Sequence, residues 1–540
     1  MSARPIISLL HPTARVKPSE QFPRGWRDAH DAWLERADHP EQIEYVLAVH
    51  ESRHSEFWDS ELFHSLRHRW GRLEIVGNEN RDCCVDQLNA AAAASCGQLL
   101  VGIQDDLYPP EHWDTLILEA LGKGGPEMFS LFSKIRESSA LQDEMILVCS
   151  SGATPERDRE LMMVGAITRP RYERYGFVLD PDFESMFADN WYAHVARRDE
   201  AAGLVKILER LDIQFEHRHP VNGYTGPQSA NPWEAVKADE VYQLQNSPQA
   251  YQDGEITFKR KLGAKVIAIA LPGQEFSSQW LHSWTVLYGH LMAARGFLTM
   301  PIFAYTSNVH CTRMEITKTV LEARHKPDYI LWVDDDNTLA PELFDMLQKD
   351  LDDNPDLAGV VGWCWCDPAD PLGDANKPYV ASCGRQSGWN PDRTENGKGL
   401  GCYMFTLEDF EHWFRLSDQL SAKGAAAPHL VSSADIFPDA FWSGFPVVLM
   451  RYSTLEQLGP EAFAPMVRPD VKFGFTSEDT SFFYKAHVAG LKFAVDMRVK
   501  VPHLKLRAIE AQYLPGVTRE EVLKAQGKRA GIPVREPAPV

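Results

Sequence analysis

The sequence predicts an α/β protein with two tandem domains, each built on a mostly parallel, Rossmann-like sheet. The chain has 540 residues, which is too many for one ordinary hydrophobic core, so two or more domains are expected. Short apolar runs alternate with helical stretches, and this alternation is typical of parallel sheets. The same order of elements (opening strand, strand, helix, strand, acidic turn) occurs twice, which indicates a duplication on the scale of a domain.

The first domain is expected to cover residues 1–220. Its strands are predicted at residues 5–10, 44–49, 73–76 and 98–103, with an Ala-rich helix at 82–96. Residues 221–263 are richer in Pro, Gly, Asn, Gln and charged residues. They are therefore expected to form a linker that contains a helix at 231–245.

The second domain is expected at residues 264–510, and a C-terminal helix and tail at 511–540. Its strands are predicted at 266–271, 329–333, 360–363, 446–450 and 491–501, with helices at 279–294 and 313–324 and a short C-terminal helix at 519–526. Strands and helices alternate here as they do in the first half, so the same type of sheet is expected.

Composition limits the function. The formal net charge of −21 argues against a broad basic surface for nucleic acid or an anionic membrane. The nine cysteines are scattered without Cys-x-x-Cys pairs, which fits free thiols in a reducing cytoplasm. The first residues lack the apolar region of a signal peptide, and the weakly polar stretch at 90–103 is too short to span a membrane. A cytoplasmic location is therefore expected.

The most informative feature is the strand at 329–333, which runs directly into Asp334, Asp335 and Asp336. Three adjacent carboxylates repel one another unless a cation or hydrogen-bond donors offset their charge. Ligands of α/β sheets bind at the carboxyl ends of strands, and the cation that suits oxygen ligands is a hard divalent metal. The alternative is that Asp336 or Asn337 caps a helix that begins near Pro341, for which one such residue would suffice.

Further residues extend this pattern along the second half. Pro272 ends the first predicted strand of the domain, where a nucleotide can lie over the sheet. Gly444 precedes another strand and allows close approach of the backbone to a ligand. Glu478 and Asp479 stand at a predicted helix start, and His503 follows the last strand.

Taken in this order, these motifs resemble family 2 glycosyltransferases with the GT-A fold, over about residues 264–507. In that family an Asp-x-Asp turn binds the metal and the nucleotide-sugar, a Glu-Asp pair carries the catalytic base, and a late His completes the metal shell. The resemblance implies the metal ligands Asp334, Asp336 and His503, and the donor-binding residues Pro272, Arg313, Asp334 and Asp335. It implies Asp479 as the general base, with Glu478 positioning it or the acceptor.

The first domain is similar to a more divergent copy, so the resemblance implies two GT-A-like domains joined by a helical linker. Ala188 replaces the usual Glu, and Asp189 remains as a possible base. The donor-binding residues implied here are Pro12, Thr13, Arg15 and Asp105, and the metal ligands are Asp106, His217 and His219.

The implied reaction is an inverting transfer of a sugar from a nucleoside-diphosphate donor to an acceptor hydroxyl, with Mn²⁺ or Mg²⁺ and most often a UDP-sugar. Two domains allow two sequential transfers, or one active domain beside a non-catalytic glycan-binding domain. The acceptor can be a glycan, a protein or a modified base. A nucleotidyltransferase is the main alternative, although residues 272–274 lack the nearby Lys or Arg of a phosphate loop. A non-catalytic scaffold would not need both Asp336 and Asp479.

Overall fold

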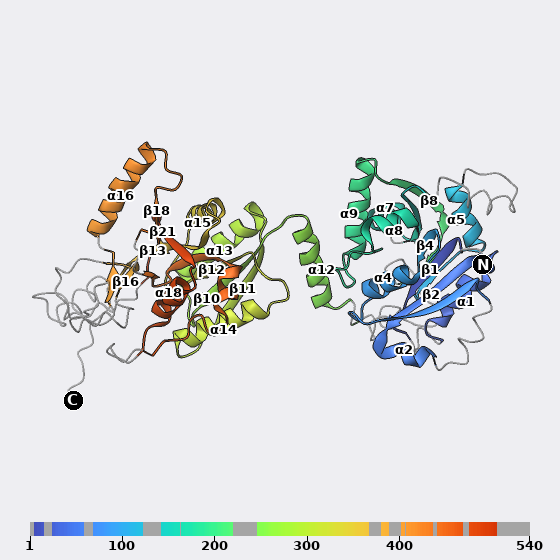
Figure 1. Ribbon diagram of the computed structural model, residues 1–540, viewed down its shortest axis with the longest axis horizontal. Helices are drawn as coiled ribbons and strands as arrows, with labels where there is room; N and C mark the ends of the chain where they lie inside the picture. Colours follow the sequence, from blue (N-terminus) through green and yellow to red (C-terminus); the bar gives the residue numbers. More distant parts are fainter. Residues whose placement is uncertain are drawn as a thin grey trace, which may run out of the picture. The chain divides into compact units, whose positions relative to one another are not determined.

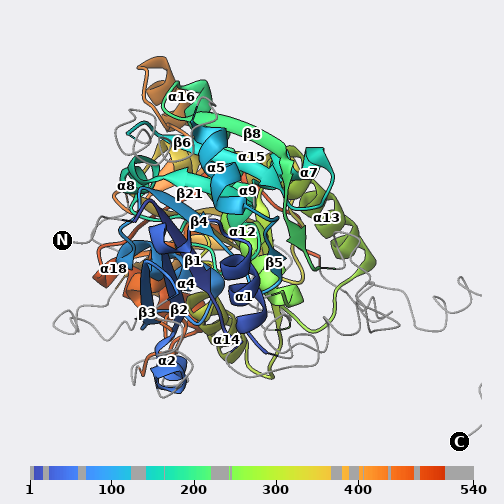
Figure 2. The same cartoon turned by 90° about the vertical axis from the view of Figure 1, so that its right-hand side faces the viewer.

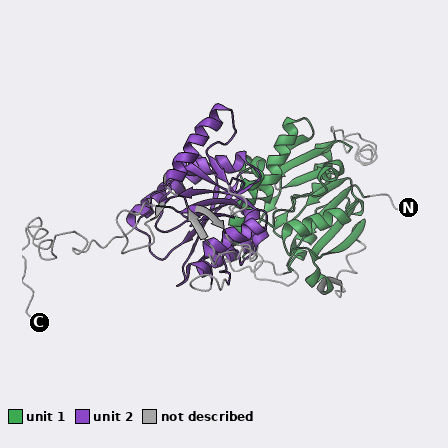
Figure 3. Cartoon of the chain, turned by 60° about the vertical axis from the view of Figure 1, so that its left-hand side comes forward, with its two compact units in different colours: residues 1–263 green, residues 264–540 purple. Residues whose placement is uncertain are grey.

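We describe a computed structural model of the chain. Placed residues are 5–15, 24–58, 69–122, 142–162, 164–219, 243, 246–366, 380–387, 401–405, 407–435, 440–467 and 475–504. The chain divides into two compact units, residues 1–263 (unit 1) and 264–540 (unit 2), which Figure 3 distinguishes by colour. Within the described residues, no helix combines the length and the apolar character that crossing a bilayer requires.

Unit 1 is built on a seven-stranded sheet with the order β3-β2-β1-β4-β7-β6-β8 (Figure 1). The strands are β1 (Ile7–Pro12), β2 (Ile43–His50), β3 (Arg72–Asn78), β4 (Leu99–Gly102), β6 (Met145–Ser150), β7 (Gly165–Thr168) and β8 (Lys206–Gln214). Only β7 runs antiparallel to its neighbours in this sheet. A separate short pair joins β5 (Leu107–Tyr108) to β9 (Glu216–His217).

Helices cover both faces of the unit 1 sheet. Successive residues of a strand point to opposite faces, so each face has its own apolar cluster. Leu9 of β1 belongs to the apolar cluster that includes α1 (Arg27–Glu35) and α5 (Trp113–Leu121). Leu10 faces the other cluster, with α4 (Cys84–Ala94) and α9 (Ala188–Ala201). The remaining helices are α2 (Glu51–Trp58), α7 (Pro155–Leu161), α8 (Arg169–Tyr175) and α12 (Pro248–Lys261), and Figure 2 gives a second view with unit 1 facing the reader.

Unit 2 has its own seven-stranded sheet, with the order β11-β10-β12-β20-β13-β21-β18. The strands are β10 (Val266–Pro272), β11 (Leu298–Ala304), β12 (Tyr329–Val333), β13 (Leu357–Trp363), β18 (Leu430–Ser432), β20 (Val447–Arg451) and β21 (Lys492–Lys500). Shorter strands are β14 (Trp365–Cys366), β15 (Val380–Ala381), β16 (Cys383–Ser387), β17 (Gly401–Met404) and β19 (Ala440–Ser443). The predicted α/β class with mostly parallel, Rossmann-like sheets is confirmed in both units.

The helices of unit 2 again flank the sheet on two faces. The apolar cluster on one face includes α13 (Ser278–Gly289) and α15 (Pro341–Asp353). The cluster on the other face includes α14 (Val309–Glu322), α17 (Tyr452–Leu458) and α18 (Glu478–Val488). A π-helical turn at His290–Ala294 follows α13, and α16 (Leu407–Ala422) completes the described helices.

The two sheets share a core of six neighbouring strands. The order β2-β1-β4-β7-β6-β8 in unit 1 matches β11-β10-β12-β20-β13-β21 in unit 2, and every pair has the same relative direction. Leu10 pairs with Gly102 where Ala270 pairs with Trp332. Asp106 follows Gly102 at the same interval as Asp336 follows Trp332, so the two acidic turns occupy equivalent places.

The helix α12 was not predicted from the sequence. The helices predicted at 231–245 and 519–526 lie outside the described residues, apart from residue 243. Gly254 in the middle of α12 weakens the helical signal. It is there because a Cβ at this position would lie 2.4 Å from the carbonyl oxygen of Met186. Ser247 caps the helix by accepting a hydrogen bond from the backbone N–H of Ala250 at 3.1 Å.

Candidate active site

The acidic turn of unit 2 begins where β12 leaves the sheet. Asp334 accepts hydrogen bonds from Nη2 of Arg313, with distances of 2.8 and 3.1 Å to its two carboxylate oxygens. Its backbone carbonyl accepts a hydrogen bond of 3.1 Å from the indole N–H of Trp280. The first Asp of the turn is therefore held from two helices, α14 and α13.

Asp336 lies beside His503, a residue distant in the sequence that was predicted to bind the same metal ion. Nε2 of His503 is 2.9 Å from Oδ2 of Asp336, and the backbone N–H of Leu504 donates to the Asp336 carbonyl at 2.6 Å. A β-bridge between Asn337 and His503 fixes this register. The two residues predicted to bind one metal ion, Asp336 and His503, are therefore neighbours.

The capping alternative is wrong. The residue that caps α15 is Ala340, and no side chain accepts a hydrogen bond from the start of that helix. The amide of Asn337 donates instead to the Pro502 carbonyl at 3.2 Å. Pro341 begins the helix as expected, and its fixed φ accounts for the start without an acidic cap.

Asp335 lies against the end of β10. A Cβ added at Gly273 would come within 2.5 Å of the Asp335 Cβ and 2.7 Å of its Oδ2, so only glycine fits there. Pro272, the last residue of β10, is buried at the same point. The loop predicted to hold the donor and the acidic turn are therefore in direct contact.

The turn carries more negative charge than its protein surroundings offset. Burial raises the pKa of Asp334 to about 8, against the effect of Arg313 and with further increases from Asp336 and Asp335. Burial and then Asp336 also raise the pKa of Asp335. Clustered carboxylates with raised pKa values and one imidazole form a donor set that suits Mn²⁺ or Mg²⁺.

The predicted catalytic pair stands at the first turn of α18. Oδ1 of Asp479 accepts hydrogen bonds from the backbone N–H of Thr480 at 2.6 Å and from the hydroxyl of Ser477. Oε1 of Glu478 lies 3.7 Å from Nε of Arg313. Burial, and then the charge of Asp479, raise the pKa of Glu478. Arg313 therefore contacts both the acidic turn and the catalytic pair.

The turn before β20 brings backbone close to the same carboxylates. A Cβ at Gly444 would lie 3.9 Å from Oδ2 of Asp479. The next residue, Phe445, takes the left-handed φ of 60°, which is rare for a residue with a side chain. Its N–H donates to the hydroxyl of Ser443 at 3.2 Å, which supports this conformation. Such backbone strain is often found at functional sites.

In unit 1, Asp105 contacts side chains from the end of β1 and from the loop that follows it. Its carboxylate is 2.9 Å from Nε2 of His11, 2.9 Å from the hydroxyl of Thr13 and 3.0 Å from Nη1 of Arg15. Burial opposes ionisation here, but these donors outweigh it and lower the pKa of Asp105. The corresponding donors are missing in unit 2, where Leu271, Gly273 and Glu275 hold the equivalent positions.

Asp106 of unit 1 repeats the arrangement of Asp336. Nε2 of His217 lies 3.4 Å from Oδ2 of Asp106, and the N–H of Arg218 donates to the Asp106 carbonyl at 2.8 Å. Burial lowers the pKa of His217, but the charge of Asp106 outweighs it and raises the pKa overall. The rings of His217 and His219 are 5.7 Å apart. The predicted ligands of unit 1 are therefore neighbours.

Asp189 lies in the first turn of α9, the helix equivalent to α18. Its Oδ1 accepts the backbone N–H of Asn190 at 2.9 Å, and burial raises its pKa. Within the described part of the chain, no hydrogen bond or ion pair joins Asp189 to Asp105 or Asp106. Pro12 ends β1 as Pro272 ends β10.

Arg157 also acts on this site, and it was not predicted from the sequence. Its positive charge acts to lower the pKa values of Asp189, His217 and His219, although other effects outweigh it for Asp189 and His217. Nothing in the sequence around Arg157 marks it as part of this site.

Two other features of the structure are not part of this site. Asp350, His429 and Asp496 each bring one potential ligand atom within 4.8 Å of the others. Nη2 of Arg498 already lies 3.1 Å from Asp350 and 2.7 Å from Asp496, and Nε2 of His429 lies 2.7 Å from Asp350. We interpret this group as a structural ion network between α15 and β21. Its residues are far apart in the sequence, so the sequence alone does not predict the network.

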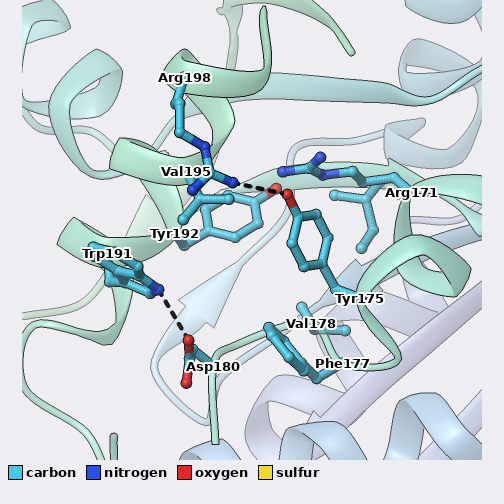
Figure 4. A pocket seen from close by; sticks show the side chains of 10 residues that line it. Arg171, Tyr175, Phe177, Val178, Asp180, Trp191, Tyr192, Val195 and Arg198 are labelled. Carbon is cyan, nitrogen blue, oxygen red and sulfur yellow. Dashed lines mark hydrogen bonds between the residues drawn. The ribbon is translucent and has the colours of Figure 1, made fainter. Parts of the chain in front are cut away.

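A pocket of about 120 Å³ lies in unit 1 between α8 and α9 (Figure 4). Its lining residues are Ile167, Arg171, Tyr175, Phe177, Val178, Asp180, Trp191, Tyr192, Val195 and Arg198. No predicted site residue lines it. Several of its polar groups are paired with protein atoms, as when Trp191 donates to Asp180 at 2.9 Å and Arg198 to the Tyr175 hydroxyl at 3.2 Å. We therefore assign the chemistry to the carboxylate sites.

No family model matches the sequence, and no curated protein matches it. Solved structures with partial similarity include S. aureus TarS, with a TM-score of 0.27 and 10% identity over 48% of this chain and 43% of that one. A mannosyltransferase, PcManGT from Pyrobaculum calidifontis in complex with GDP-Man and Mn²⁺, matches with a TM-score of 0.26 and 14% identity over 55% and 83%. Glucosyl-3-phosphoglycerate synthase from Mycobacterium tuberculosis, in complex with Mn²⁺ and UDP-glucose, gives 0.23 and 11% over 51% and 82%. The chain spans less than half of TarS, and TM-scores below 0.5 assign no family.

Proposed function

We propose that unit 2 is a GT-A-type glycosyltransferase that moves a sugar from a nucleoside-diphosphate donor to an acceptor hydroxyl. The observation that carries this proposal is the contact of Arg313 with both Asp334 of the acidic turn and Glu478 of the catalytic pair. The same turn places Asp336 beside His503. A nucleotidyltransferase has no need of a carboxylate pair on a second helix. A scaffold has no need of the raised pKa values.

A divalent cation fits the residues present. Asp336 and His503 would hold Mn²⁺ or Mg²⁺, with Asp334 close by, because a carboxylate and an imidazole at one point suit such an ion. When bound, the cation supplies positive charge to the departing diphosphate. Gly273 lets the backbone at the end of β10 lie directly against Asp335, next to Pro272, where the donor would bind.

The acceptor hydroxyl must lose its proton as it attacks the anomeric carbon. Asp479 is the proposed general base, and its Oδ1 is oriented by Ser477 and Thr480. Glu478 would position the acceptor or Asp479 itself. No described residue is needed as a covalent nucleophile, so we propose a single displacement with inversion, most simply from a UDP-sugar. The acceptor class (glycan, protein or modified base) stays open.

The experiment that tests this function is a screen of nucleotide-sugars for release of the nucleoside diphosphate, with Mn²⁺ and with EDTA. We expect release from at least one donor, faster with an acceptor and lost with EDTA. Failure of the wild-type chain to bind or consume any nucleotide-sugar in Mn²⁺ would refute the proposal.

Unit 1 is a second candidate site, because Asp106 and His217 repeat the contact of Asp336 and His503. We propose Asp106, His217 and His219 as metal ligands, Asp189 as its base, and Pro12, Thr13, Arg15 and Asp105 as its donor loop. Asp105 is already bonded to Thr13 and Arg15 of that loop and to His11 of β1, so its role would be to shape the loop. Ala188 leaves Asp189 without an acidic partner, which favours a supporting role over a second transfer.

The cysteines agree with a cytoplasmic location, which we also propose. Thiols rather than disulfides are found at positions 83, 84, 96, 149, 311, 364 and 383. Burial raises the pKa of Cys83 to about 11, so this thiol stays protonated and unreactive at neutral pH.

We expect Gly273→Ala to weaken Mn²⁺ and donor binding by about 1–3 kcal/mol, because the new methyl group must displace Asp335. Titration of Mn²⁺ and then of donor, followed by calorimetry, measures the effect. Gly289→Ala is the matched control, since nothing lies within 4 Å of a Cβ there. Equal affinities in the two variants would contradict the contact between Gly273 and the turn.

Stabilisation by Mn²⁺ should depend on pH. The pKa of Asp334 is raised from 3.8 to about 8, so the folded protein holds this proton more tightly than the unfolded chain does. Without metal, the folded state therefore loses stability as pH rises between these values. We expect Mn²⁺ to raise the Tm more at pH 7.5 than at pH 5.5, because the cation offsets the charge that appears. A Tm increase that is larger at the lower pH would contradict this charge balance.

A further inference from the structure

Arg313 is the most deeply buried cation among the described residues of unit 2. Its residue is only 2% exposed, on the second turn of α14. The guanidinium carbon lies 4.7 Å from the ring centroid of Phe445, 5.7 Å from that of Trp332 and 5.8 Å from that of Phe463. A charge in such an aromatic enclosure is costly unless it is paired, so its partners define what it does.

Both partners of Arg313 belong to the proposed site, and they come from different elements. Nη2 donates to Asp334, at the end of β12, at 2.8 Å. Nε faces Glu478, at the start of α18, from 3.7 Å. These two segments are more than a hundred residues apart in sequence, and Arg313 is the group that links them electrostatically.

The guanidinium is not saturated by these contacts. Nε and Nη1 are buried and make no hydrogen bond to any described residue. A buried donor without a partner costs about 1–3 kcal/mol, and natural proteins keep few of them. A distance between Glu478 Oε1 and Arg313 Nε shorter than the present 3.7 Å would give Nε a hydrogen-bond partner. We therefore expect this contact to shorten when the site is occupied.

We propose that Arg313 is a positioning residue that sets the catalytic pair of α18 relative to the acidic turn, through Glu478 on one side and Asp334 on the other. This proposal rests on the glycosyltransferase function proposed for unit 2. It differs from the role implied by the family resemblance, in which Arg313 would contact the donor directly. The Arg313 guanidinium is buried, enclosed by aromatic rings and in contact with Asp334 and Glu478. We therefore expect it to act on the reaction through those two carboxylates.

The test compares Arg313→Met and Arg313→Lys with the wild-type chain. Met keeps much of the volume without the charge, while Lys keeps the charge without the planar fork that spans two carboxylates. We expect both variants to lower kcat on the order of 10²-fold, as small misplacements of catalytic groups do, with a smaller change in donor KM. Mn²⁺ affinity, measured by electron paramagnetic resonance, should be unchanged or tighter in Arg313→Met, because a competing positive charge is removed.

Arg451→Met is the matched control. Arg451 is another arginine of unit 2, at the end of β20, and its Nε donates to the Leu357 carbonyl at 3.0 Å. We expect this variant to lose stability without a change in kcat per folded molecule. If Arg313→Met instead weakens Mn²⁺ binding and lowers Tm with kcat unchanged, Arg313 has only a structural role and the proposal is overturned.

A double-mutant cycle covers the case in which Arg313→Met fails to fold. The losses in kcat of Arg313→Lys and Glu478→Gln should not add, because each breaks the same link. Additive losses would contradict the linkage. If the wild-type chain consumes no nucleotide-sugar, the proposed function fails. The linkage is then judged from the additivity of the two substitutions in Mn²⁺ affinity and unfolding free energy.

Discussion

Asp336→Ala is expected to abolish Mn²⁺-dependent release of nucleoside diphosphate, with a loss on the order of 10³-fold or more in kcat. A cation at a leaving diphosphate contributes several kcal/mol to the transition state, and each 1.36 kcal/mol is about a factor of ten. Asp336 is the residue whose carboxylate meets His503 at 2.9 Å, so its removal leaves the cation without its proposed anchor. Product release under saturating donor and Mn²⁺ measures the loss.

The controls for this prediction come from the same chain. The side chain of Asp336 is 39% exposed, and its carboxylate bonds only to His503 among the described contacts, so we expect the Tm to change little. Asp106→Ala makes the equivalent change in unit 1. If only Asp336→Ala is inactive, unit 2 carries the transfer. If Asp106→Ala also removes a Mn²⁺ site or part of the activity, unit 1 is a second working site. Full activity in both variants would refute the site assignments.

The parts of the site that the sequence predicted are those set by local pattern and order. The apolar run at Tyr329–Val333 could only be a buried strand, and the carboxylates that follow it had to lie at the sheet edge. The acidic residues Glu478 and Asp479 begin α18, where a helix start favours them. Chain order then places His503 after the last strand, and its pairing with Asp336 was implied by the family resemblance.

The parts that the sequence could not predict depend on three-dimensional contact. Arg313 reads as one basic residue on an ordinary helix, and its burial depends on the rings of Phe445 and Phe463, which arrive from distant segments. Gly273 gives no signal beyond a turn, although the place of Asp335 depends on it. Helix α12 was missed because Gly254 is unfavourable for a helix locally and needed for close packing.

Comparison of the two units shows how one scaffold gives two different electrostatic environments. In each, an Asp that follows the third strand of the shared core meets a His that follows the last one, beside a short antiparallel β contact. In unit 1 the preceding Asp105 is neutralised by donors from its own loop, whereas in unit 2 Asp335 has none of these. We therefore expect unit 2 to need an external cation more than unit 1 does, and expect the larger metal effect there.

Asp479→Asn is expected to lower kcat by about 10²–10⁴-fold while leaving Mn²⁺ and donor affinities within a few-fold of the wild type. Loss of a general base costs about this much. The amide oxygen of Asn can still accept the hydrogen bond that Oδ1 takes from Thr480, at 2.6 Å, so the start of α18 should be preserved. What the substitution removes is the capacity to take the acceptor proton. Single-turnover transfer measures this step separately from binding.

The companion substitution Glu478→Gln separates the two carboxylates. Glu478 lies closer to Arg313 and its pKa is raised by burial, so its charge has a positioning role rather than that of the primary base. We therefore expect Glu478→Gln to cost less than Asp479→Asn. If Glu478→Gln is the more damaging change and Asp479→Asn keeps kcat within a few-fold, the two roles are reversed. The base would then be the carboxylate that is paired with Arg313, and the linkage through that arginine would regulate the proton transfer directly.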